Sequence, residues 1–92
     1  MKLWRIELNN GDWFLWFATA KSLAVHGMWN MHYADGLDWS EFLIEYGPRT
    51  KQVDDGEIIE ATDFNGTNKT QTAAKWCEGK TNGPFLSNTY EV

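Results

Sequence analysis

The sequence is poor in residues that build several common kinds of site. It has one cysteine, Cys77, and two histidines, which excludes an internal disulfide and leaves too few ligands for a closed structural zinc site. Its longest apolar run, residues 13–18, is far shorter than the roughly 18 residues that a membrane helix needs. We therefore expect no metal cofactor and no membrane association.

Positive charge and catalytic motifs are also scarce. Eight lysines and arginines against thirteen acidic residues give a net charge of −5, which disfavours direct binding of nucleic acid. No phosphate-binding glycine loop or nucleophile elbow is present. Cys77 has only His26 and His32 as conceivable bases, and a lone cysteine on a helix usually packs as a small core residue. The sequence thus predicts a protein that is not an enzyme and uses no cofactor.

The length and composition are those of one domain, residues 1–92. Hydrophobic residues make up 42% and charged residues 23% of the chain, as in ordinary globular proteins. Six tryptophans, three tyrosines and five phenylalanines are more than so small a core easily hides, so some should reach the surface. The chain opens directly on a strand-like pattern rather than a secretory leader. Together with the single cysteine, this predicts a cytoplasmic location.

A hairpin over residues 2–18 is the clearest local prediction. Two apolar-rich runs flank Asn10-Gly11, and Asn-Gly favours a two-residue type I′ turn. With those two residues as the turn, the opposed apolar pairs are Leu8 with Trp13, Ile6 with Leu15, and Trp4 with Phe17. This register would place six apolar side chains on one face and Arg5 over Trp16 on the other.

A helix is expected to pack on that apolar face. Thr19 can cap a helix that runs from Ala20 to about Met31. Its predicted buried stripe follows helical spacing and consists of Ala20, Leu23, Ala24, Gly27, Met28 and Met31.

The second half of the chain is more ambiguous. Residues 38–46 fit a helix that starts with a capping box at Asp38 and Glu41, but their bulky side chains also fit a strand, which we expect. A second hairpin should turn at residues 54–56 and pair 57–64 with 49–53. Residues 65–72 read as a loop, 71–78 as a short helix stopped by Gly79, and 85–90 as a last strand.

Together these elements predict an α+β fold. It would have an antiparallel sheet of four or five strands, one main helix packed on one face, and a second short helix.

Charge is distributed unevenly along the chain. Residues 35–63 hold nine of the thirteen acidic residues and only two basic ones, Arg49 and Lys51, a net charge of −7. Such a region is either a solvated face or an acidic docking surface that a basic groove attracts. The predicted partner-binding residues are Asp35, Asp38, Trp39, Glu41, Glu45, Tyr46, Asp54, Asp55, Glu57 and Glu60.

The first 25 residues, a hairpin that runs directly into a helix, resemble the start of many small inhibitor proteins of bacteriophages and mobile elements, including some anti-CRISPR proteins. The resemblance implies an intracellular inhibitor acting in the host cytoplasm, and the acidic region predicts that this non-catalytic protein binds a basic groove of a host protein. The first alternative is an intracellular assembly module that self-associates, for example as a homodimer. The second is a small-ligand or sugar-binding domain that uses exposed tryptophan.

Overall fold

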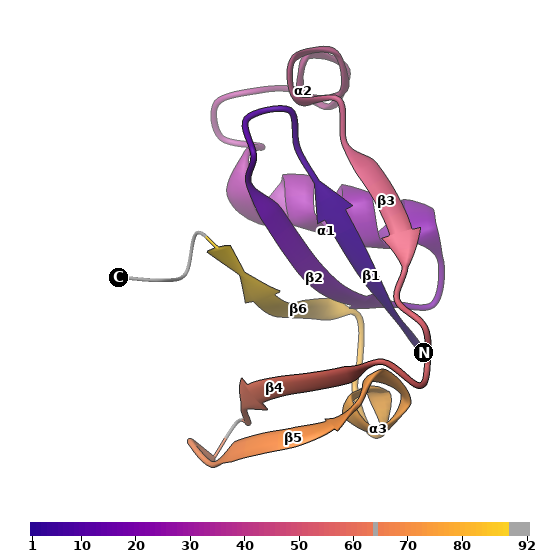
Figure 1. Ribbon diagram of the computed structural model, residues 1–92. Coiled ribbons are helices and arrows are strands. Elements are labelled where there is room, and N and C mark those ends of the chain that lie inside the picture. The colour runs from indigo at the N-terminus through magenta and orange to yellow at the C-terminus, as the bar shows by residue number, and fades with distance from the viewer. Residues whose placement is uncertain (64, 89–92) are drawn as a thin grey trace.

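The computed structural model describes residues 1–63 and 65–88, and it has the predicted α+β architecture. Its elements are β1 (Lys2–Glu7), β2 (Trp13–Ala18), α1 (Lys21–His32), α2 (Trp39–Tyr46), β3 (Arg49–Gln52), β4 (Ile58–Thr62), β5 (Asn68–Thr72), α3 (Ala73–Cys77) and β6 (Gly83–Ser87). Four strands form an antiparallel sheet in the order β3-β1-β2-β6, while β4 and β5 form a separate pair (Figure 1). In the described part of the chain, no helix is long and apolar enough to cross a membrane.

The four-stranded sheet is covered on both faces, so its central strand β2 is a continuous apolar run. Helix α1 crosses one face, and the β4-β5 pair with α3 lies against the lower part of the other face in Figure 1. The main helix on one face is confirmed. The second covering layer explains why both faces of β2 are apolar: five of its six residues are buried.

The hairpin between β1 and β2 forms, but the predicted register is wrong by one residue. The Leu8 amide donates to the Asp12 carbonyl at 2.9 Å, and the Gly11 amide donates to the Leu8 carbonyl at 3.1 Å. Gly11 has φ +93°, so the loop has three residues and ends in a glycine bulge instead of a two-residue turn. Ile6 consequently pairs with Phe14 rather than with Leu15.

This shift redistributes the expected apolar face. Residues of β1 and β2 that pack toward α1 are Trp4, Ile6, Phe14, Trp16 and Ala18, while Leu3, Leu15 and Phe17 pack into the second cluster. The Arg5 guanidinium lies 4.8 Å from the ring centroid of Trp13, not over the buried Trp16.

Helix α1 occupies almost the predicted range, but its start and its buried stripe differ from the prediction. Ala20 is the N-cap and makes no side-chain cap, so Thr19 does not cap the helix. Ala24 and Met28 are buried as expected, and Val25 joins them. Leu23 and Met31 are 47% and 55% exposed because the sheet reaches only one narrow arc of the helix.

Residues 39–46 form a helix, so the predicted strand is wrong. The Asp38 carboxylate accepts from the Glu41 amide at 2.8 Å, which caps the first turn. Gly47 ends the helix in a left-handed conformation with φ +48°. Phe42, on the inner side of the helix, is fully buried. The caps at both ends outweigh the β preference of the bulky side chains.

The predicted second hairpin is also wrong. Strand β3 pairs with β1, where Thr50 lies opposite Ile6, and β4 pairs with β5, where Ile59 lies opposite Gln71. The turn at 54–57, closed by a 3.0 Å bond from the Glu57 amide to the Asp54 carbonyl, therefore leads from one sheet to the other.

Residues 68–72 are strand β5 rather than loop. The loop between β4 and β5 is closed in the same way as the loop of the first hairpin. The Asp63 amide donates to the Thr67 carbonyl at 2.8 Å, and Gly66 has φ +82°.

The end of the chain follows the prediction more closely. Helix α3 is confirmed within the expected 71–78, and Gly79 after it has φ +70°. Strand β6 begins two residues before the expected position, at Gly83. Of the predicted segments, Phe64 and the end of the last strand at Tyr90 lie outside the described residues.

Candidate functional site

The ten predicted partner-binding residues lie on two separate parts of the molecule. Asp35, Asp38, Trp39, Glu41, Glu45 and Tyr46 belong to α2 or the segment before it, whereas Asp54, Asp55, Glu57 and Glu60 belong to β4 or the turn that precedes it. In Figure 1, α2 lies at the top and β4 near the bottom. The fold therefore does not bring them together as one surface.

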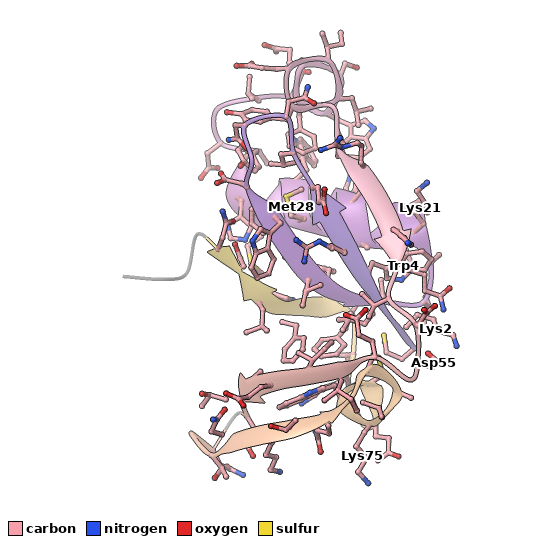
Figure 2. The ribbon with its side chains drawn as sticks, viewed as in Figure 1. Lys2, Trp4, Lys21, Met28, Asp55 and Lys75 are labelled. Atoms are coloured by element: carbon pink, nitrogen blue, oxygen red, sulfur yellow. The ribbon has the colours of Figure 1, made fainter. Side chains whose placement is uncertain are left out.

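Several carboxylates of the lower group are matched by polar partners. Asp55 forms a 3.0 Å ion pair with Lys2, and the two are neighbours in Figure 2. Glu60 accepts hydrogen bonds from the side chains of Asn68 and Thr70 at 3.5 and 3.4 Å. Asp54 and Glu57 line a shallow hollow that Arg5 and Lys51 share. This lower group is thus a mixed-charge surface.

The carboxylates around α2 are different, because no cation in the described chain pairs with them. Residues 35–46 contain four acidic residues and no lysine or arginine. Asp38 is used as the helix cap, while the other three, Asp35, Glu41 and Glu45, are exposed. The protonated Glu41 carboxyl donates a hydrogen bond to the Asp38 carboxylate, and this bond together with the negative charge of Asp38 raises the pKa of Glu41 above its ordinary value. Unpaired negative charge is therefore concentrated on this helix.

Two apolar side chains lie among these carboxylates, and the sequence analysis did not single them out. Ile44 is 84% exposed and Leu43 is 39% exposed. Ile44 lies three residues after Glu41 and next to Glu45, so one helical face combines the isoleucine with both carboxylates. We call Asp35, Glu41, Leu43, Ile44 and Glu45 the α2 surface. The sequence signal for this surface is helical spacing: in a helix over residues 38–46, Glu41, Ile44 and Glu45 fall on one face.

The two aromatic residues of the predicted site are largely engaged inside the protein. The Trp39 ring packs against His26 at 5.1 Å and Trp29 at 5.5 Å between centroids. Tyr46 packs on Phe42 at 5.6 Å, and neither Trp39 nor Tyr46 is an exposed residue. These rings attach α2 to α1 and stabilise the helix that presents the α2 surface.

The candidate nucleophile and bases are kept apart. Cys77 is the last residue of α3, and its side chain packs in the cluster between α3 and the sheet. His26 and His32 belong to α1 on the other face of the sheet. Burial raises the pKa of the Cys77 thiol, which favours the unreactive protonated form. Among the described residues, no group of histidine, cysteine, aspartate and glutamate side chains could hold a metal ion.

A cleft of about 510 Å³ lies between α3 and β6. A small-ligand-binding domain would hold its ligand in a cleft of this kind. Phe17, Trp76 and Phe85 line it together with Asp63 and Lys80. Trp76 is 3% exposed and its indole N–H is bonded to the Ile59 carbonyl at 2.9 Å. All six tryptophans are buried or half-buried, and none is among the exposed large hydrophobic side chains.

Comparison with protein-family models, with curated proteins and with solved structures found no significant match.

Proposed function

We propose that this protein is a non-catalytic binding module that docks the α2 surface onto a basic surface of another protein. The observation that carries the proposal is Ile44, a large apolar side chain that is 84% exposed on the same helix face as Glu41 and Glu45. An apolar side chain with carboxylates beside it matches the composition of an interface, in which an apolar centre is surrounded by polar and charged residues. The complex would bury the isoleucine and neutralise the acids.

The two kinds of side chain have separate roles in this complex. Asp35, Glu41 and Glu45 attract a positively charged partner and raise the association rate. Ile44 and Leu43 become desolvated in an apolar pocket and slow dissociation, as central residues of an interface do. The partner surface must accordingly have an apolar pocket surrounded by lysine or arginine.

Surfaces of that composition occur where proteins bind nucleic acid, since phosphate binding requires clustered cations. We infer that the chain inhibits such a host protein by occupying its basic groove, in the manner that the resemblance to phage-encoded inhibitors implies. The site of action would be the host cytoplasm, where Cys77 would remain reduced.

Two matched charge reversals test this proposal. One variant replaces Asp35, Glu41 and Glu45 by lysine, and its control replaces Asp54, Asp55 and Glu57 by lysine. Both change three carboxylates to ammonium groups, so the net charge shifts equally. Asp38 is left intact in the first variant because it caps α2.

The partner is first captured with a photo-crosslinker at position 44 and then purified for binding kinetics. We expect the α2 reversal to slow association by about tenfold or more and to weaken its salt dependence, while the control retains most of the association rate. Ile44→Asp should speed dissociation instead. Equal losses in the two reversals, or binding that salt does not affect, would contradict the proposal. Crosslinking of position 44 only to a second copy would favour the assembly-module alternative.

A further inference from the structure

Strand β3 is an edge of the four-stranded sheet, and half of its backbone hydrogen-bonding groups point outward. The Val53 amide donates to the Leu3 carbonyl at 2.9 Å, which fixes the alternation of bonded pairs along the β1-β3 ladder. Arg49 and Lys51 therefore bond to β1, whereas Thr50 and Gln52 direct their N–H and C=O groups away from it. Within the described chain, no other segment accepts from or donates to these groups.

An open apolar groove runs beside this free edge. It has a volume of about 540 Å³, and Ala20, Val25, Trp39, Leu43, Pro48 and Thr50 line it. Lys21, at the start of α1, also lines the groove, and Figure 2 shows it beside the outer edge of β3. Thr50 pairs with Ile6, whose side chain packs toward α1, so the groove lies on the α1 side of the strand.

The opposite face of the same strand is cationic. Arg49 and Lys51 point away from α1, where they lie beside Glu7 and Arg5 on β1. Glu7 is shared by Arg5 at 2.8 Å and Arg49 at 3.7 Å, and these two guanidinium groups lower its pKa. Lys51 has no ion-pair partner in the part of the chain described. On the strands themselves, Arg5, Arg49 and Lys51 thus face a single carboxylate, Glu7. Asp54 and Glu57, which share a hollow with Arg5 and Lys51, lie beyond the end of β3.

We propose that the β3 edge binds an extended strand of another protein in which acidic and apolar side chains alternate. The added strand would run antiparallel to β3 and bond to the backbone of Thr50 and Gln52. Its residue opposite Thr50 would place an apolar side chain in the groove. Its residues opposite Arg49 and Lys51 would form non-hydrogen-bonded pairs, in which side chains approach most closely, and would carry carboxylates.

Charge selects this occupant over a second copy of the chain. Antiparallel pairing of β3 with β3 of another copy would bring Arg49 and Lys51 against the same cations of that copy. Like charges on opposed positions destabilise a sheet, and edge lysines commonly prevent such pairing. A strand with acidic residues at alternate positions reverses the sign of these contacts.

The test uses a synthetic peptide with the core Glu-Val-Glu-Val-Glu and NMR spectra of the intact protein. We expect amide shifts to change at Thr50 and Gln52, with slower hydrogen exchange at these two amides in the complex. The amides of Arg49 and Lys51, already bonded to β1, should be protected with or without peptide. Shifts confined to the outer side of α2, around Ile44, would overturn the proposal.

Variants distinguish strand addition from simple charge attraction. Thr50→Pro removes an outward N–H without removing a bond to β1, and proline is tolerated on edge strands, so peptide binding should be lost while the fold persists. Arg49→Glu with Lys51→Glu should weaken binding of the Glu-Val-Glu peptide by about tenfold or more and create binding of a Lys-Val-Lys peptide. If Thr50→Pro does not fold, this exchange of charge specificity still tests the proposal.

The control for the exchange replaces Lys69 and Lys75 by glutamate. These cations lie on β5 and α3, outside the groove and away from β3. Binding of the Glu-Val-Glu peptide that persists in both exchange variants, or that is lost equally in both, would refute the assignment to the β3 edge. Leu43 belongs to both the α2 surface and the groove lining, whereas Ile44 does not line the groove. Ile44→Asp should therefore leave peptide binding unchanged, which separates this proposal from the function proposed for the α2 surface.

Discussion

Gly27 of α1 packs directly against the indole of Trp16 in β2. A Cβ atom at Gly27 would lie 3.0 Å from Nε1 of Trp16, closer than nearly all such contacts in proteins. Trp16 is 3% exposed and enclosed by the core, so it has little room to move. This glycine sets how closely the main helix approaches the sheet.

Gly27→Ala should therefore destabilise the protein even though alanine favours a helix. Overpacking a core costs about 1 to 3 kcal/mol, and the helix preference returns about 1 kcal/mol, so a net loss of about 1 kcal/mol is expected in urea unfolding. Combined with Trp16→Leu, which vacates the space, the cost of Gly27→Ala should become smaller. A stabilising effect of Gly27→Ala alone would contradict the contact.

The three-residue hairpin loop predicts a specific cost at Gly11. Gly11→Ala should lower the free energy of unfolding by about 1 kcal/mol, because φ +93° is unfavourable for a residue with a Cβ atom. Gly36→Ala is the matched control: both positions have open space around an added Cβ, but Gly36 has no positive φ. Equal losses of stability in the two variants would contradict the positive φ angle of Gly11.

The pKa of Glu41 should depend on Asp38. Because the folded state raises this pKa, the folded protein binds the Glu41 proton more tightly than the unfolded chain does. The resulting stabilisation is present below the pKa of the unfolded chain and is lost as the pH rises through the folded pKa. Asp38→Asn keeps a helix-capping side chain but removes the charge.

Carboxyl NMR titration measures this directly. The pKa of Glu41 should fall toward its ordinary value in Asp38→Asn, with the helix retained. An unchanged Glu41 pKa in that variant would show that Asp38 is not the cause.

Cys77 should be structural rather than reactive. Burial raises its pKa, so a thiol reagent at pH 8 should react slowly with the folded protein and rapidly after unfolding. Because the folded pKa is raised, the associated stability is present below the unfolded pKa and is lost as pH rises through the folded value. Cys77→Ala should retain partner binding. Rapid modification that abolishes binding without unfolding would require a functional role for this thiol.

Much of the local structure was predictable from short sequence signals. The Asn-Gly pair at 10–11, the residues 73–77 before Gly79, and the spacing of Ala24 and Met28 each indicated the correct kind of element. The capping box at Asp38 and Glu41 also indicates a helix, and the predicted strand is wrong because this cap outweighs the β preference of the neighbouring side chains.

The hairpin register was not determined by the apolar pattern, because both faces of β2 are buried. Residues 13–18 are apolar at every position, so a shift of one residue still leaves apolar side chains on each face. The bulge at Gly11 decided between the two registers, and the second covering layer made either pattern compatible with burial.

The sequence by itself determined the fold class, the hairpin-helix opening and the excess of acidic residues in 35–63. Only the tertiary structure decided that those acids lie on two separate surfaces, that the Trp39 and Tyr46 rings pack against neighbouring rings, and that Ile44 and the β3 edge face solvent. The physical reason is that exposure and strand pairing depend on contacts between distant segments. Pairing of β3 with β1, rather than with β4, placed Arg49 and Lys51 beside Arg5 and left the other edge of β3 open.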